Sequence, residues 1–135
     1  MANKIIIMKN LIVDATRDKI FLTLIVSENI YTCSHENSKI NFEKLIILIN
    51  DFLKINSCSL DQIDVIYANR GPGSFAGIRN SLATIKALFL TKKINYCCFS
   101  FDDFLGFEDV KYENVPSLCD KFKIKKNLIN PIYLS

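Results

Sequence analysis

The sequence contains few of the residues that build metal centres and disulfide frameworks. It has one histidine, no tryptophan and five cysteines, and no two cysteines show the C-x-x-C spacing of common zinc ligands. An odd number of cysteines without that spacing indicates neither a disulfide scaffold nor a zinc site. We therefore expect free thiols, no bound metal and a reducing, cytoplasmic environment.

Long apolar runs and a strong net charge are also absent. Half of the residues are hydrophobic, yet no apolar run approaches the roughly 20 residues that cross a bilayer. The net charge of +3 is too small to indicate nucleic-acid binding by itself. A chain of 135 residues is long enough for one domain with one core. We expect a soluble, unsecreted protein with no membrane partner.

Glycine, proline and arginine are scarce, and they gather in residues 69–79 (NRGPGSFAGIR). This stretch holds three of the four glycines, one of the three prolines and two of the three arginines. Lysine outnumbers arginine 14 to 3, so an arginine here indicates that its planar fork of donors is needed. The stretch is therefore the first candidate for a functional site.

Short β-rich runs and two amphipathic patterns predict an α/β chain. Three runs near the N-terminus are joined by connections of a few residues, which predicts antiparallel strands. Apolar residues that recur every three or four positions predict two helices further along. The predicted elements are strands at 10–14, 19–26, 29–33, 64–69 and 95–100, helices at 41–55 and 75–90, and one or two helical turns at 101–107.

This order of elements predicts a mixed five-stranded sheet flanked by helices. Strand–helix–strand crossovers are right-handed and place the last two strands parallel to the first. Such a sheet is the core of ribonuclease H-like and actin-like ATPase folds. After Glu108 the pattern weakens into lysine-rich segments. Among them, residues 121–126 (KFKIKK) alternate like an edge strand whose exposed lysines guard against aggregation.

The glycine-rich stretch lies between a predicted strand and a predicted helix, where open α/β sheets form their sites. Gly71 and Gly73 allow a tight turn, and the Ser74 hydroxyl is placed to cap the helix that starts at Phe75. A helix start of this kind can hold an anion. No lysine follows the glycines at the spacing of a Walker motif. A purely structural turn and an anion site both remain open.

The predicted helix after this turn carries signs of a docking face. Gly77 inside a helix costs about 1 kcal/mol relative to alanine, which predicts the close approach of another group. Arg79 near the helix start is opposed by the helix dipole, which indicates a partner carboxylate or phosphate. Packing inside its own domain is the alternative. The predicted interface residues are Arg70, Gly73, Ser74, Phe75, Gly77, Arg79, Ser81 and Thr84.

Asp14 is the second candidate, because it ends the first predicted strand in residues 14–16 (DAT). A carboxylate there can order a metal-bound water or polarise a nucleophile, or it can close an Asx turn. His35 lies in a polar connection and is expected to be solvated rather than catalytic. No catalytic residue is assigned. The candidate nucleotide or anion contacts are Asp14, Thr16, Gly71, Gly73 and Ser74.

Residues 64–79, continuing through 81–88, resemble the signature segment of the TsaB family, also called YeaZ. Weaker likenesses occur in the same order at residues 11–16, 45–53, 100–104 and 131–134. The resemblance implies a single actin-like, or Gcp-like, lobe. It also implies a role in the bacterial machinery that installs threonylcarbamoyladenosine in tRNA.

The resemblance further implies a non-catalytic scaffold subunit. In that family the related subunit TsaD binds the metal and performs the transfer, and an ATPase, TsaE, joins the pair. The chain is then expected to pair with a TsaD-like subunit through the helices at 41–55 and 75–90, or with itself when alone. It is expected to reach tRNA only through the complex. No cofactor is expected on the chain alone, and ATP or ADP only at a shared interface.

The sequence departs from the family pattern at three places. Ala76 stands where threonine is usual, Asn41 lies near a position that is commonly histidine, and full-length relatives carry a second lobe after the position of Phe107. The predicted domains are therefore an actin-like lobe over 1–107 and a short remnant tail over 108–135. Two other functions stay open: a minimal actin-like ATP-binding phosphotransferase that uses Asp14, and a homodimeric interaction module that has lost the modification role.

Overall fold

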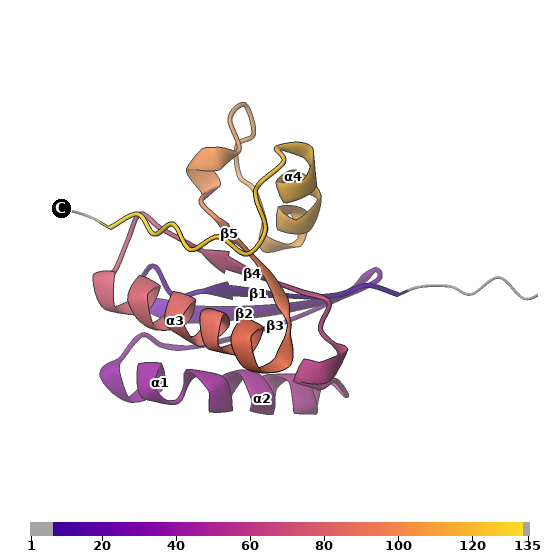
Figure 1. The fold of residues 1–135 in the computed structure, drawn as a ribbon, viewed down its shortest axis with the longest axis vertical. Helices are drawn as coiled ribbons and strands as arrows, with labels where there is room; N and C mark the ends of the chain where they lie inside the picture. The colour runs from indigo at the N-terminus through magenta and orange to yellow at the C-terminus, as the bar shows by residue number, and fades with distance from the viewer. Residues whose placement is uncertain (1–6, 134–135) are drawn as a thin grey trace, which may run out of the picture.

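Five strands form one mixed sheet in the computed structural model, which describes residues 7–133 (Figure 1). The strands are β1 (Lys9–Asp14), β2 (Lys19–Val26), β3 (Asn29–Glu36), β4 (Val65–Asn69) and β5 (Asn95–Phe99). In the sheet order β3-β2-β1-β4-β5, the pairs β3–β2 and β2–β1 are antiparallel, whereas β1–β4 and β4–β5 are parallel. The predicted mixed five-stranded sheet is confirmed.

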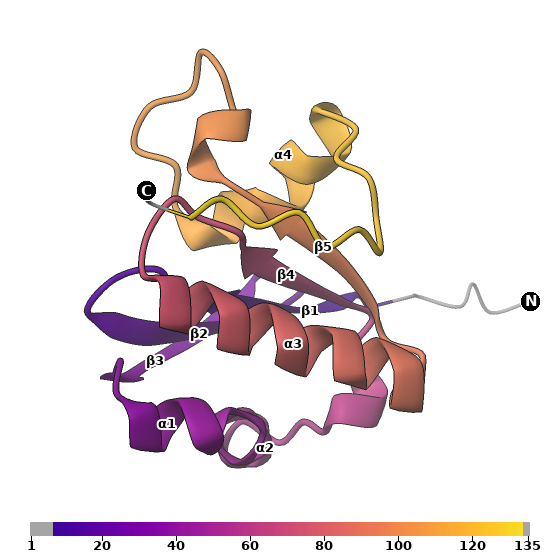
Figure 2. The same cartoon turned by 60° about the vertical axis from the view of Figure 1, so that its left-hand side comes forward.

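Helices cover both faces of this sheet (Figures 1 and 2). One face carries α1 (Lys39–Glu43), α2 (Leu45–Ile55) and α3 (Phe75–Lys92), and the other carries α4 (Val115–Lys121). Single 3-10 turns lie at Leu60–Gln62, Phe101–Asp103 and Tyr112–Asn114. In the described part of the chain, no helix has the length and apolarity needed to cross a bilayer.

The larger core lies between the sheet and the helices α2 and α3. Side chains alternate between the faces of a strand, so alternate residues of β1 and β2 point toward these helices. In α2 the buried side chains recur at three- and four-residue steps, which turns one stripe of the helix toward the sheet. The fully buried members of this core include Leu11, Val13, Leu22, Leu24, Ile49, Leu53, Ile66, Ile78 and Ile85.

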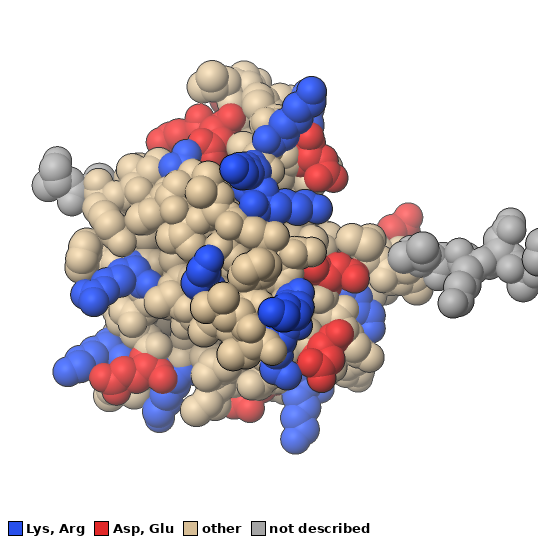
Figure 3. Space-filling view, viewed as in Figure 1, with Lys and Arg blue, Asp and Glu red and all other residues tan. Residues whose placement is uncertain are grey.

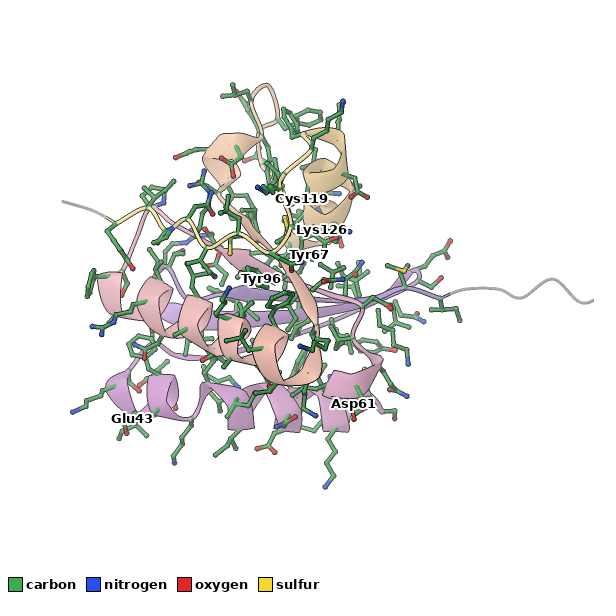
Figure 4. The ribbon with its side chains drawn as sticks, in the orientation of Figure 1. Glu43, Asp61, Tyr67, Tyr96, Cys119 and Lys126 are labelled. Carbon is green, nitrogen blue, oxygen red and sulfur yellow. The ribbon has the colours of Figure 1, made fainter. Side chains whose placement is uncertain are left out.

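A second core fills the opposite face of the sheet. Residues that follow β5 cover the strand side chains Ile12, Tyr67 and Phe99, and these residues include Phe104, Val115, Leu118 and Cys119. Figure 4 shows Cys119 of α4 close to Tyr67 of the sheet. The segment after Glu108, for which the sequence predicts only a weak pattern, therefore packs over the sheet and closes its second face.

Two boundaries near the first helices differ from the prediction. The single helix expected over 41–55 is interrupted at Lys44, whose φ of −105° and ψ of 12° are not helical. The helical stripe continues across the break, which is why periodicity alone does not reveal it. In addition, β3 extends to Glu36, so His35 lies in a strand opposite Ile20 rather than in a connection.

The predicted edge strand at 121–126 is wrong. Lys121 ends α4, Lys123 has a left-handed φ of 54°, and the Ile124 N–H donates to the Cys119 carbonyl at 2.9 Å, as in common helix ends. Lys126 alone makes a bridge, to Cys97, within the described residues. The alternating apolar residues belong to a helix end packed on the second core.

After this bridge the chain runs back beside α3 (Figures 1 and 2). The Ile132 N–H donates to the Arg70 carbonyl at 2.7 Å, and the ring centroids of Tyr133 and Phe75 are 4.7 Å apart. The C-terminal segment is therefore held against the glycine-rich turn and the start of α3. Leu134, the last residue of the 131–134 likeness, lies outside the described residues.

The second core predicts how the segment after β5 contributes to stability. Leu118 is 7% exposed and Leu105 is 79% exposed, so the same truncation has different consequences. We expect Leu118→Ala to lower the free energy of unfolding by about 2–4 kcal/mol, and Leu105→Ala to change it by less than about 0.5 kcal/mol. Urea unfolding measures both. Equal, small effects would mean that α4 does not pack on the sheet.

Candidate functional site

The two predicted motifs meet at the carboxyl ends of β1 and β4. These strands are parallel neighbours, with Val13 opposite Ala68, so Asp14 and Asn69 end their strands side by side. Open α/β sheets form their sites at this edge. The Ser74 N–H donates to the Thr16 carbonyl at 2.8 Å, which places the glycine-rich turn directly against the turn between β1 and β2.

Asp14 is buried at this junction, and both of its carboxylate oxygens are occupied. Oδ1 accepts from the Thr16 N–H at 3.0 Å and from the Thr16 hydroxyl at 2.7 Å. Oδ2 accepts from the Asn69 amide at 3.0 Å and from the Tyr112 hydroxyl at 2.6 Å. Four donors fill the acceptor capacity of a carboxylate. The geometry supports the Asx-turn alternative for Asp14 rather than the activation of a nucleophile.

Tyr112 and Asn69 connect this carboxylate to two other segments. Burial, together with the neighbouring Asp14 carboxylate, raises the pKa of the Tyr112 hydroxyl, which therefore stays protonated and donates at neutral pH. The Asn69 side chain also accepts from the Gly71 N–H at 2.9 Å. Asp14 thus joins the β1–β2 turn, the glycine-rich turn and the segment that leads into α4.

Gly73 and Gly77 allow the two turns to touch. A Cβ atom on Gly77 would overlap the carbonyl oxygen of Ala15, and one on Gly73 would overlap that of Thr16. The close approach predicted at Gly77 therefore exists, but the approaching group belongs to the same chain. We correct the interpretation of Gly77 as room for a partner: the residue is buried and fixes α3 against the β1–β2 turn.

Arg70 is also engaged within the chain. Its guanidinium donates to both oxygens of Asp103, at 2.6 and 3.3 Å, and to the Asn130 carbonyl at 3.2 Å. The paired side chains are each 17% exposed. The sequence correctly predicts that the planar guanidinium of Arg70 is needed, because it binds a carboxylate through two hydrogen bonds. That carboxylate, however, belongs to Asp103 of the same chain rather than to a partner. Gly71 lies beside it with φ of 109°, and a Cβ there would overlap the Ile132 carbonyl.

The remaining predicted interface residues divide into two groups. Ser74 caps α3 by accepting from the Gly77 N–H at 3.2 Å, which confirms the predicted cap, and Ser81 is buried with its hydroxyl donating to the Ile78 carbonyl. Ser81 therefore has an internal role. The residues that keep an accessible surface are Phe75, Arg79 and Thr84, and Arg79 makes no ion pair with any residue between 7 and 133.

Thr84 lines an apolar groove on the outer side of the helices. The groove has a volume of about 570 Å³ and lies between α2, the turn at Leu60–Gln62 and α3. Its lining consists of Ile46, Asn50, Ser59, Leu60, Asp61, Thr84, Ala87, Leu88, Thr91 and Lys92. Figure 3, which views the α3 side, shows areas without charged side chains between scattered lysine, arginine, aspartate and glutamate side chains.

Two hollows lie beside Asp14 at the strand ends. The smaller, about 270 Å³, is lined by the predicted anion contacts Thr16 and Gly71, together with Arg17, Asn69, Pro72, Ser100, Phe101 and Asp102. Asp14, Gly73 and Ser74 are not part of its lining. The larger, about 540 Å³, is lined by four aromatic and four charged residues together with Val110. Across residues 7–133, no cluster of three or more His, Cys, Asp or Glu side chains could hold a metal ion.

Sequence reasoning missed three residues that hold this junction together. The Asn37 amide donates to the carbonyl of Ala15 at 3.0 Å and to that of Arg17, and Asn69 and Tyr112 donate to Asp14. An asparagine at a strand end before a glycine turn is a local signal that could have revealed Asn69. No local signal exists for Tyr112, which lies 98 positions from Asp14.

Part of the chain is homologous to a curated protein. The "tRNA threonylcarbamoyladenosine biosynthesis protein TsaB" of Buchnera aphidicola subsp. Baizongia pistaciae (strain Bp) is 37% identical over 65 residues. The alignment covers 42% of this chain and 29% of that protein, so the chain matches less than a third of the relative's length. No protein-family model matches the chain.

Solved structures identify the fold. YeaZ from Pseudomonas aeruginosa superposes with a TM-score of 0.63 at 19% identity, covering 69% of this chain and 44% of YeaZ. A second Pseudomonas aeruginosa structure, described as similar to peptidase YEAZ, gives the same score and identity and is covered to 43%. The chain therefore has the fold of one YeaZ-like, actin-like lobe and spans less than half of these proteins, which confirms the predicted fold class.

The fit of Gly77 predicts an unusual sign for a glycine-to-alanine change in a helix. Helix propensity alone favours alanine by about 1 kcal/mol, but the added methyl group would displace the Ala15 carbonyl. We expect Gly77→Ala to lower the free energy of unfolding by about 1–3 kcal/mol, as overpacking does. Thermal or urea unfolding measures it. A stabilised variant would show that α3 and the β1–β2 turn are not in contact.

The bond between Tyr112 and Asp14 predicts a cost for removing one hydroxyl. Tyr112→Phe leaves the buried carboxylate short of a donor, so we expect the free energy of unfolding to fall by about 1.5–3 kcal/mol. Tyr31→Phe, at an exposed strand position, serves as the matched control and should change it by less than about 0.5 kcal/mol.

The same bond predicts a pH dependence. Because burial raises the pKa of Tyr112 in the folded chain, its contribution is complete below the ordinary value of 10.0 and is lost as the pH rises above it. Stability measured from pH 8 to 11 should therefore fall less steeply in Tyr112→Phe than in the wild type. Identical slopes would contradict the burial of this hydroxyl.

Proposed function

We propose that this chain, which is homologous to TsaB over part of its length, is a cytoplasmic, non-catalytic scaffold subunit for the threonylcarbamoyl modification of tRNA. In this proposal it pairs with a TsaD-like catalytic subunit, a TsaE-like ATPase joins the pair, and tRNA is reached through the complex. The homology to TsaB carries the proposal, because that relative is named for the biosynthesis of threonylcarbamoyladenosine in tRNA.

The state of Asp14 supports a non-catalytic role. A residue that activates a nucleophile needs a free oxygen within hydrogen-bond distance of the reacting group. Both oxygens of Asp14 instead accept two hydrogen bonds each from the chain itself. This arrangement weighs against the alternative of a minimal phosphotransferase that uses Asp14.

The groove between α2 and α3 is the surface that we assign to the TsaD-like partner. Outside the groove lining, large apolar side chains are exposed on the same helices, with Ile47 at 52%, Ile55 at 81% and Leu90 at 60%. Exposed apolar surface of this kind, rimmed by charged groups such as the Lys92–Asp61 pair, is typical of protein interfaces. The accessible predicted residues Phe75, Arg79 and Thr84 lie on the same helix α3.

A substitution in the groove tests this assignment. Ala87 is exposed and lines the groove, so Ala87→Arg should fill it without disturbing either core. We expect binding to the TsaD-like subunit to weaken about tenfold or more, as at a central interface position. Modification should fall with it when tRNA is incubated with that subunit, the TsaE-like ATPase and the adenylate-forming enzyme.

Ser117→Arg provides the matched control, because it adds the same side chain to the exposed surface of α4 on the other face of the sheet. It should leave pairing and modification unchanged. Full modification in a reaction that omits this chain would refute the scaffold role. Normal pairing of Ala87→Arg would instead move the interface elsewhere. Chromatography of the wild type and of Ala87→Arg, each alone, shows whether the chain pairs with itself through the same groove.

A further inference from the structure

An aromatic pocket lies at the strand ends, on the sheet face opposite α2 and α3. Its volume of about 540 Å³ falls in the range of small-molecule sites. The β1–β2 turn and β2 form one wall, and the segment between β5 and α4 forms the other. The lining residues are Arg17, Asp18, Phe21, Phe101, Phe107, Asp109, Val110, Lys111 and Tyr112.

Three rings form a continuous row in this pocket. Tyr112 lies between Phe21 and Phe101, with centroid distances of 6.0 and 5.9 Å and interplanar angles of 38° and 43°. All three side chains are half-buried, so each packs on the protein and keeps part of its surface toward the pocket. The hydroxyl of Tyr112 is held by Asp14 at 2.6 Å, which fixes the central ring before any ligand arrives.

Charged groups of both signs surround the rings. Arg17 and Lys111 supply donors, Asp18 and Asp109 supply acceptors, and all four are exposed. None of them forms an ion pair with another residue of the described range 7–133. The pocket therefore has no net charge with which to attract a simple anion. It offers a planar apolar surface flanked by separate donor and acceptor groups.

We propose that this pocket binds a nucleobase that carries a phosphate, either as a free nucleotide or as an unpaired base of RNA. A planar base stacks on aromatic side chains whatever its sequence. An exocyclic amine can donate to Asp18 or Asp109, and a phosphate can accept from Arg17 or Lys111. The 270 Å³ hollow beside the pocket shares Arg17 and Phe101 with it and adds polar groups for the phosphate.

The aromatic pocket contains none of the nucleotide contacts predicted from the sequence, and only Thr16 and Gly71 of that set line the adjoining hollow. From the family resemblance, ATP or ADP is expected only at an interface shared with a partner. The aromatic pocket needs no partner chain to form it, since Phe101 and residues 107–112 supply its second wall. It also lies across the sheet from the groove assigned to the TsaD-like partner. Binding here and pairing there can therefore fail independently.

Calorimetric titration of the whole chain tests the proposal with AMP, adenosine, ribose 5-phosphate, a short unpaired oligoadenylate and duplex RNA. We expect saturable binding of AMP that is tighter than binding of adenosine or ribose 5-phosphate, because both parts are recognised. Oligoadenylate that binds about tenfold tighter than AMP would identify RNA as the source, and equal or weaker binding would identify the free nucleotide. Absence of saturable binding by both AMP and oligoadenylate overturns the proposal.

Two pairs of variants locate the site. Lys111→Glu should weaken AMP about tenfold but adenosine little, whereas Lys125→Glu, an exposed control outside the pocket, should change neither. Phe101→Leu should weaken AMP about 5- to 100-fold, with Phe75→Leu as its control. Unfolding midpoints verify that each variant is folded. Affinities within twofold of the wild type for both pocket variants would place the ligand elsewhere and overturn the proposal.

Discussion

A buried carboxylate holds one end of this sheet together. Asp14 is 1% exposed and accepts hydrogen bonds from residues of three segments that are far apart in the chain. Burying a charge costs free energy unless hydrogen bonds compensate it, so the loss of any one donor to Asp14 destabilises the whole junction. The Asp14 side chain consequently positions the glycine-rich turn, the β1–β2 turn and the segment that leads into α4. The surfaces on both faces of the sheet depend on the positions of these segments.

The two faces of the sheet carry surfaces of different chemistry. The α2–α3 side presents an apolar groove over the larger core, and the α4 side presents an aromatic pocket beside the second core. Helix α3 touches the β1–β2 turn through Gly77, and that turn supplies Arg17 and Asp18 to the pocket. One turn therefore stands between the two surfaces, with its backbone against the helix and its side chains toward the pocket.

The sequence predicts the sheet and the main helices well, because their burial follows periods of two and 3.6 residues. It predicts the segment after Glu108 poorly, since residues such as Val115 and Leu118 form a pattern only when placed against Tyr67 and Phe99 of the sheet. At the site, the unfavourable helix propensity of glycine predicts that another group approaches Gly77 closely. It does not predict which group, because a missing Cβ leaves the same space for a carbonyl of its own chain as for a partner. Arg70 shows the same limit: the need for a guanidinium is visible in the sequence, but the identity of its carboxylate, Asp103, is not.

The backbone of the β1–β2 turn, residues 15–18, is fully hydrogen-bonded to other segments through its carbonyl groups. Each of its four backbone carbonyls accepts a hydrogen bond: those of Ala15 and Arg17 from the Asn37 amide, that of Thr16 from the Ser74 N–H, and that of Asp18 from the Asn37 N–H. An inserted residue would break some of these hydrogen bonds, and a deleted residue would leave their donors without acceptors. Arg17 and Asp18, however, direct exposed side chains away from these contacts. The fold therefore fixes the length of this turn and the buried residues Ala15 and Thr16, whereas it leaves the side chains at positions 17 and 18 open to substitution.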